Sequence, residues 1–178
     1  EQILHYVHHD LVQLGKLNLN DLMRFKGIGE AKAISVVASM ELGRRRQAEY
    51  HTKANIIKSS KDIYCLLLSD MSDLITEEFW VIFLNHRNKI IGKERISSGG
   101  LTATVVDVRI LFKQAIERLA TSIIIAHNHP SGTLKPSRAD IQLTQKIKNA
   151  SKLLDIQLLD HLIVADSGYY SFADEGCL

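Results

Sequence analysis

Residues 122–140, SIIIAHNHPSGTLKPSRAD, decide the fold of this chain. The run Ser122-Ile-Ile-Ile-Ala126 is apolar and β-branched, which is typical of a buried strand. His127 and His129 follow where that strand ends, and because one residue separates them their side chains project to the same face. Two prolines and a glycine then predict a loop, after which the pattern becomes helical. A strand, a loop and a helix in this order indicate an α/β protein with its chemistry at the strand end.

Three side chains of this segment form a candidate metal site. Two neutral imidazoles and one carboxylate are a ligand set of catalytic zinc, and they leave the fourth tetrahedral position for water. His127, His129 and Asp140 provide that set, so we predict one Zn²⁺ per chain and a hydrolase. Two simpler interpretations stay open. Ser137 and Asp140 also have the spacing of an N-cap residue and an N3 acid that begin a helix, and the histidines can belong to a turn without a metal.

The same residues carry a family resemblance. His127, His129, Ser137 and Asp140 match the pattern H-x-H-x7-S-x2-D without a gap, and this pattern resembles the signature of the JAMM/MPN+ metalloproteases. The wording HNHPSG, with LLDHLI at 158–163 and YSFAD at 170–174, resembles the bacterial RadC (UPF0758) branch of that family. The resemblance extends over nearly the whole chain. It implies a JAMM/MPN (cytidine-deaminase-like) fold, with a mixed sheet flanked by helices, and a zinc-dependent metallopeptidase activity.

The resemblance also implies roles for individual residues. The family has a catalytic glutamate at the start of an upstream apolar strand, and EFWVIFL at 78–84 looks like that element. We assign the role to Glu78, with Glu77 as the competitor. Glu78 would take a proton from the metal-bound water, and Ser137 would donate a hydrogen bond to the oxyanion of the transition state. We place His161 outside the site, as a buried histidine of a strand.

The hydrophobic pattern changes near residues 50–60 and predicts two parts. Residues 1–52 have helical periodicity, with Ile3, Leu4, Val7 and Leu11 on one stripe, and are expected to form a small all-helical module. Residues 56–178 are expected to form the JAMM/MPN-type domain. Its predicted helices are 60–74, 108–120 and 140–153, and its predicted strands are 79–85, 89–96, 122–126, 160–165 and 169–171. Strands alternating with helices make α/β the fold class.

Residues 22–33, LMRFKGIGEAKA, resemble a helix-hairpin-helix motif. Gly27 and Gly29 permit close approach of the backbone, so that amides at the start of the next helix can face a DNA phosphate. Lys26 and Lys32 would strengthen the contact, and residues 1–60 carry nine basic against six acidic side chains. We expect DNA binding that is independent of sequence and weakens steeply with salt. The alternative is a tight connection between two helices without a nucleic-acid role.

Composition excludes several classes of protein. With 178 residues and 46% hydrophobic residues, the chain can bury a core without disulfides or metals. No apolar run approaches the roughly 20 residues of a membrane span, and no secretory pattern is present, so we expect a cytoplasmic protein. Cys65 and Cys177 form no metal-binding spacing. The sequence starts in a helical pattern at Glu1, and the resemblance implies further helices upstream.

Three functions follow, in decreasing order of support. The first is a zinc-dependent peptidase or isopeptidase that is recruited to DNA. The second is a DNA-associated repair accessory or binding protein whose metal site is structural or vestigial. The third is a metal-dependent nuclease, which ranks last because a two-metal site needs more carboxylates than this sequence places near the ion. The sequence does not identify the peptide or protein substrate.

Overall fold

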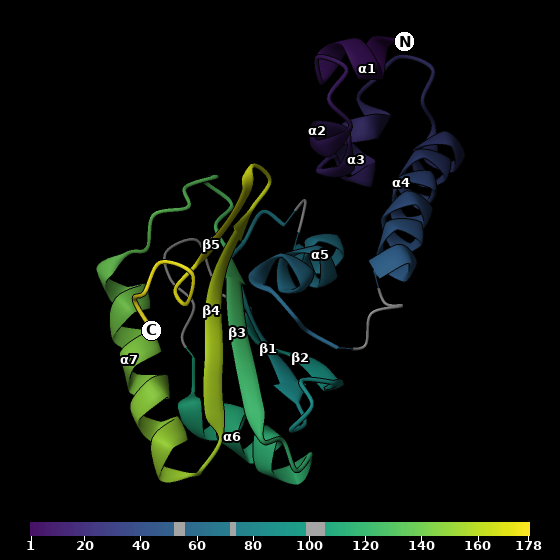
Figure 1. Cartoon of the computed structure of the whole chain (residues 1–178). Coiled ribbons are helices and arrows are strands. Elements are labelled where there is room, and N and C mark those ends of the chain that lie inside the picture. Colours follow the sequence, from purple (N-terminus) through teal and green to yellow (C-terminus); the bar gives the residue numbers. More distant parts are fainter. Residues whose placement is uncertain (52–55, 72–73, 99–105) are drawn as a thin grey trace.

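The computed structural model describes residues 1–51, 56–71, 74–98 and 106–178 (Figure 1). The chain begins with four helices, α1 (Gln2–Tyr6), α2 (Leu11–Gly15), α3 (Leu19–Met23) and α4 (Glu30–His51). Strands and helices then follow in the order α5 (Ser60–Met71), β1 (Glu78–Leu84), β2 (Ile90–Ser98), α6 (Val108–Glu117), β3 (Ser122–Asn128), α7 (Arg138–Leu153), β4 (Gln157–Ala165) and β5 (Gly168–Ser171). This order confirms the predicted α/β class with a helical N-terminal part.

The five strands form one mixed sheet in the order β2-β1-β3-β4-β5. β3 and β4 run parallel, with α7 between them in the sequence, and the other neighbouring pairs are antiparallel. At the turn between β1 and β2, the backbone N–H of Asn85 donates to the Lys89 carbonyl at 3.0 Å. Asn88 has a positive φ of 55° there, which asparagine tolerates better than most residues. The combination of parallel and antiparallel strand pairs confirms the predicted mixed sheet.

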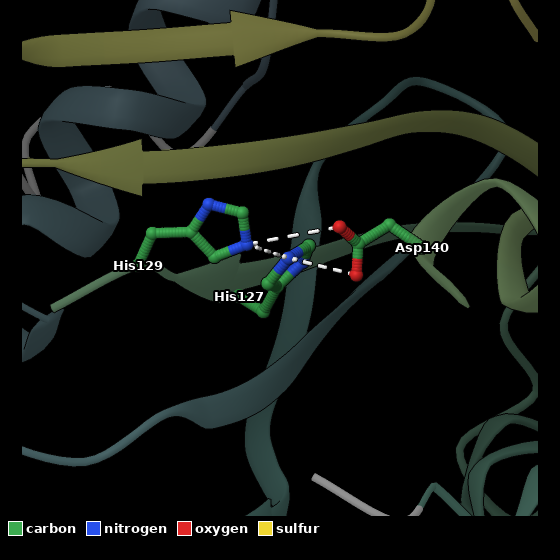
Figure 2. Close-up of side chains that lie close together, drawn as sticks. All are labelled: His127, His129 and Asp140. Carbon is green, nitrogen blue, oxygen red and sulfur yellow. Dashed lines mark hydrogen bonds and ion pairs between the residues drawn. The ribbon is translucent and has the colours of Figure 1, made fainter. Parts of the chain in front are cut away.

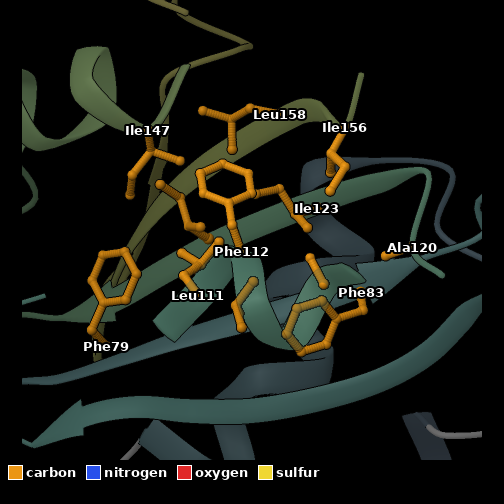
Figure 3. Packing of buried hydrophobic residues seen from close by; sticks show 12 residues of the cluster. Phe79, Phe83, Leu111, Phe112, Ala120, Ile123, Ile147, Ile156 and Leu158 are labelled. Carbon is orange, nitrogen blue, oxygen red and sulfur yellow. The ribbon is translucent and has the colours of Figure 1, made fainter. Parts of the chain in front are cut away.

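Alternate residues of the central strands enter two cores, one on each face of the sheet. Phe79 and Phe83 of β1 join the cluster that includes residues of α6 and α7, part of which Figure 3 shows. Ile82 and Leu84 join the cluster formed with α5. Because both faces are covered, the central strands are apolar on both sides. His127 lies on the same face as Phe79, which is the face that α7 covers.

The N-terminal helices contact the remainder of the chain through polar groups. The guanidinium of Arg44 in α4 donates to the Ser69 carbonyl of α5. The ammonium of Lys16 lies 2.7 Å from the Asp166 carboxylate, after β4. α3 begins with a capping box in which Asn18 and Asp21 each accept a hydrogen bond from the other's backbone N–H. The predicted boundary between residues 52 and 56 falls mostly outside the described residues, so the division stays a prediction.

The observed elements begin and end close to the predicted positions. α6 ends at Glu117 instead of 120, because Leu119 has a left-handed φ of 54° that ends the helix. β4 begins at Gln157, earlier than predicted, where its backbone N–H donates to the Thr121 carbonyl next to β3 (3.0 Å). None of the helices in the described ranges combines the length and apolar character that crossing a membrane requires.

Candidate metal centre

The end of β3 brings two histidines to one side of the sheet. His127 lies opposite Phe79 of β1 and is 5% exposed. His129 lies just beyond the strand, where its backbone N–H donates to the Val164 carbonyl of β4 at 2.9 Å. Gly132 then turns the chain with a φ of +79°, a conformation that glycine adopts without strain. The strand ladder therefore fixes the positions of both histidines before the loop begins.

The loop fixes the ring of His129. Its Nδ1 atom lies 2.6 Å from the Thr133 carbonyl oxygen. A carbonyl can only accept a hydrogen bond, so Nδ1 carries the hydrogen and Nε2 keeps its lone pair. In the tautomer that this hydrogen bond selects, His129 presents its bare Nε2 atom to the inside of the site, and this is the form that binds metals.

Asp140 enters the site from the first turn of α7, where it also caps the helix. One carboxylate oxygen accepts from the Ser137 backbone N–H at 2.7 Å. The Ser137 hydroxyl oxygen accepts from the Asp140 backbone N–H at 3.2 Å. This capping box orients the carboxylate toward the histidines at the end of β3. The capping interpretation and the metal-ligand interpretation are therefore compatible.

The donor atoms of the three residues converge, as Figure 2 shows. The Nε2 atoms of His127 and His129 are 3.0 Å apart. The Oδ1 atom of Asp140 lies 3.4 Å from His127 Nε2, and its Oδ2 atom lies 3.7 Å from His129 Nε2. Tetrahedral zinc with bonds of about 2.1 Å holds its ligand atoms about 3.4 Å from one another. With one ligand atom from each residue, the three atoms lie within 4.8 Å of one another, and the chemistry of the donors fits a single zinc ion.

The charge of Asp140 also suits a metal. Burial by itself would raise the pKa of this carboxyl, but the adjacent His127 ring, together with two hydrogen bonds involving Ser137, outweighs burial and holds the pKa well below its ordinary value. The group is therefore ionised at neutral pH. One carboxylate with two neutral imidazoles leaves a fourth position for water or substrate.

His161 of β4 lies directly behind His127, although the sequence analysis placed it outside the site. Its Nε2 atom is 2.9 Å from Nδ1 of His127, and its Nδ1 atom is 2.6 Å from the Thr144 hydroxyl of α7. The side chain has no exposed surface. Burial, and next the proximity of the His127 ring, lowers the pKa of His161 well below its ordinary value, so the ring is neutral. The sequence carried the signal of a histidine in an apolar strand, but not its register against β3.

The structure places Glu78 on the opposite face of the sheet from the histidines. Phe79 is the residue of β1 that pairs with His127, and side chains alternate along a strand. The carboxylate of Glu78 accepts hydrogen bonds from Trp80 Nε1 at 3.0 Å and Arg95 Nη1 at 2.7 Å. It lines a separate cavity of about 390 Å³, beside the N-terminal helices. Glu78 therefore does not reach the candidate metal centre.

Glu77 lies at the candidate metal centre instead. It lines a cavity of about 530 Å³ together with Ser137 and all three candidate ligands. Asn128, which the sequence analysis did not consider, holds this segment in place. Its side chain accepts from the Glu78 backbone N–H at 2.7 Å and donates to the Thr76 carbonyl at 3.0 Å. Because Asn128 is the last residue of β3, these two hydrogen bonds hold Glu77 at a fixed position relative to the end of β3.

The predicted nucleic-acid residues lie in the turn between α3 and α4 and, for Lys32, in the first turn of α4. Lys26, Gly27, Gly29 and Lys32 are all exposed. Gly27 has a φ of +84°, and a side chain there would meet no atom within 4 Å. The Lys32 ammonium donates to the Gly27 carbonyl at 2.9 Å, so it supports the turn. In Figure 1 the N-terminal helices lie on the side of α5, away from α7.

Comparison with known proteins identifies the family. The family model described as RadC-like JAB domain matches residues 57–177. A UPF0758 protein of Flavobacterium johnsoniae is 52% identical over 167 residues, which are 94% of this chain and 73% of that protein. A UPF0758 protein of Porphyromonas gingivalis is 44% identical over 180 residues, which cover 100% of this chain and 79% of that protein. A UPF0758 protein of Methanosarcina mazei is 39% identical over 170 residues, which cover 96% of this chain and 74% of that protein. The resemblance in the histidine motif thus extends along the chain, which belongs to the RadC-like JAB domain (UPF0758) family.

Proposed function

We propose that this chain is a zinc-dependent metallopeptidase that hydrolyses a peptide or isopeptide bond. The observation that carries the proposal is the convergence of His127, His129 and Asp140, whose ligand atoms lie close enough together to hold one metal ion. When bound, zinc would polarise the scissile carbonyl and lower the pKa of its water from near 16 toward roughly 7.

Residues around the ion would perform the remaining steps. We assign proton transfer to Glu77 in place of Glu78, because Glu77 lines the same cavity as the ligands. Its carboxylate would accept the proton of the attacking water and deliver it to the leaving nitrogen. The Ser137 hydroxyl oxygen accepts from the Asp140 backbone N–H, and a hydroxyl can donate its own hydrogen at the same time. Ser137 is exposed to the cavity and would donate to the oxyanion that forms on the carbonyl.

Two features favour catalysis over the structural or vestigial metal site of the alternative hypothesis. Structural zinc sites are closed by four protein ligands, whereas this site has three and opens onto a cavity of about 530 Å³. A nuclease is less well supported, because within the described residues this is the one cluster of three or more metal-binding side chains, and it contains a single carboxylate. A two-metal phosphodiesterase site needs several.

Metal analysis tests the site directly. We expect about one zinc per chain in protein purified without chelators, and loss of that zinc in His129→Ala. His86→Ala is the matched control, because His86 is exposed in the turn between β1 and β2 and should keep the metal. Wild-type protein without metal after gentle purification would refute the proposal. A screen of fluorogenic peptides and lysine-linked isopeptides would then identify the class of bond.

We also propose that the turn between α3 and α4 contacts the DNA backbone without reading its sequence. Its support is the open surface at Gly27 and Gly29, next to the exposed Lys26. Each lost phosphate contact should lower the slope of log affinity against log salt by about 1. Lys26→Ala should therefore reduce the slope, while Lys146→Ala, an exposed lysine of α7, should not. Equal slopes for both variants and wild type would refute the contact.

A further inference from the structure

A chain of hydrogen bonds behind the candidate ligands connects β3, β4 and α7. It runs from the backbone carbonyl of Asp140 to the Thr144 hydroxyl (2.6 Å), and from that hydroxyl to Nδ1 of His161 (2.6 Å). From Nε2 of His161 it continues to Nδ1 of His127 (2.9 Å). Both ends of the chain are candidate ligands, because the carboxylate of Asp140 and Nε2 of His127 face the same point.

The direction of every hydrogen bond in this chain follows from its first member. Thr144 has one hydroxyl hydrogen, and the Asp140 carbonyl can only accept it. The Thr144 oxygen must therefore accept from Nδ1–H of His161, which leaves Nε2 of His161 as an acceptor. Nδ1 of His127 must then carry a hydrogen and donate to His161. The Nε2 atom of His127 is left with its lone pair, which a metal ligand needs.

The opposite direction would disable the ligand. A hydroxyl hydrogen of Thr144 pointing at His161 would put the ring hydrogen of His161 on Nε2. His127 would then accept at Nδ1 and carry its own hydrogen at Nε2, where the metal should bind. The carbonyl of Asp140 prevents this arrangement because it has no hydrogen to donate.

Packing holds the intermediate ring in place. The rings of His161 and Phe172 are stacked, with centroids 4.7 Å apart and planes inclined by 8°. Phe79 meets His161 edge-on, with centroids 5.9 Å apart. Thr144 is 3% exposed and His161 has no exposed surface, so neither group exchanges its partner for water.

We propose that Thr144 and His161 are positioning residues, which hold His127 in the tautomer that binds zinc and tie its ring to the helical turn that carries Asp140. The inference rests on the proposed function, because the ion is the zinc of that site. Such partners behind a ligand typically contribute 10-fold to 100-fold in metal affinity. Neither Thr144 nor His161 itself lines the cavity that would meet a substrate.

Zinc affinity, measured by competition with a chelator, tests the effect of the hydroxyl. Thr144→Val keeps the shape but not the hydroxyl, and it should weaken zinc binding by roughly 10-fold or more. Thr144→Ser restores the hydroxyl and should bind like wild type. Ser151→Ala is the matched control, because Ser151 is 2% exposed on the same helix and its hydroxyl also donates to a backbone carbonyl, that of Lys148, at 2.9 Å. Wild-type affinity in Thr144→Val, or an equal loss in Ser151→Ala, would overturn the proposal.

The tautomer of His161 gives a second test that does not depend on activity or on a variant. In zinc-loaded protein labelled with ¹⁵N-histidine, long-range ¹H–¹⁵N spectra distinguish the protonated ring nitrogen from the bare one. We expect the hydrogen of His161 on Nδ1. A hydrogen on Nε2 would overturn the direction of the chain even if zinc is bound. Failure of the wild type to bind zinc would instead refute the proposed function, so the two failures are distinguishable.

Discussion

Replacing each of two adjacent glutamates with glutamine should produce opposite defects. The Glu78 side chain is 7% exposed and accepts hydrogen bonds from Trp80 and Arg95. Glutamine can keep an acceptor for one donor but loses the charge. A hydrogen bond to a charged group contributes about 1.5–3 kcal/mol. The Arg95 side chain is 53% exposed and can return to water, which lowers the expected loss of stability to about 1–2 kcal/mol.

This loss converts to a measurable change in melting temperature. For a protein of this size, 1 kcal/mol corresponds to about 2–4 °C, so Glu78→Gln should lower the Tm by roughly 2–8 °C. Zinc content and turnover per folded molecule should stay near the wild-type values, because Glu78 faces away from the ligands. Scanning calorimetry and metal analysis measure both quantities on the same sample.

Glu77→Gln should have the complementary effect on catalysis. Loss of a general acid–base group lowers turnover by about 10²-fold to 10⁴-fold, and zinc content should not change because Glu77 is not one of the three ligands. The assay is cleavage of the best peptide found by screening, compared for the two variants and wild type. Loss of turnover in Glu78→Gln with full activity in Glu77→Gln would refute the assignment of faces.

Three further predictions concern the metal, a buried acid and the core. Zinc at 100 times its Kd should stabilise the protein by about 2.7 kcal/mol, which scanning fluorimetry would detect as a rise in Tm that His129→Ala lacks. Burial raises the pKa of Asp160, so ionisation of this group lowers the stability of the wild type as the pH rises from its unfolded pKa near 4 toward its raised folded pKa. In urea titrations between about pH 3 and 7, the stability of Asp160→Asn should therefore rise relative to that of the wild type as the pH increases. A relative decrease over the same range would contradict this. Ile147 of α7 has no exposed surface and packs in the core between this helix and the sheet. Ile147→Ala should lower the free energy of unfolding by about 2–5 kcal/mol, and a loss below about 1 kcal/mol in urea denaturation would refute its place in the core.

The sequence predicted the parts of the site that depend on local geometry. Two histidines one residue apart on a strand share a face whatever surrounds them. Ser137 and Asp140 have the spacing of a capping box, and that box is present in the structure. Both features need only the dihedral angles of one short segment. The strand, loop and helix that carry these residues were predictable for the same reason.

His161 depends on the pairing of two strands, which local patterns do not specify. It follows from the parallel register of β4 against β3, in which His161 pairs with Ile125 and Ile163 pairs with His127. That register contains an irregularity between Ile123 and Ile124. An irregularity of one residue changes which side chains are neighbours. The contact between His161 and His127 therefore had no signal in the spacing of either strand.

The choice between Glu77 and Glu78 was a question of which face each residue occupies. A strand with one solvent-exposed face alternates apolar and polar residues, and that alternation shows which residues point to which face. β1 is covered on both sides, so Phe83 and Leu84 are equally buried although they enter different cores. The apolar run consequently marks the strand but not its faces. Only the antiparallel pairing of Phe79 with His127 shows that odd-numbered residues face the metal, and a shift of one residue would have exchanged the two glutamates.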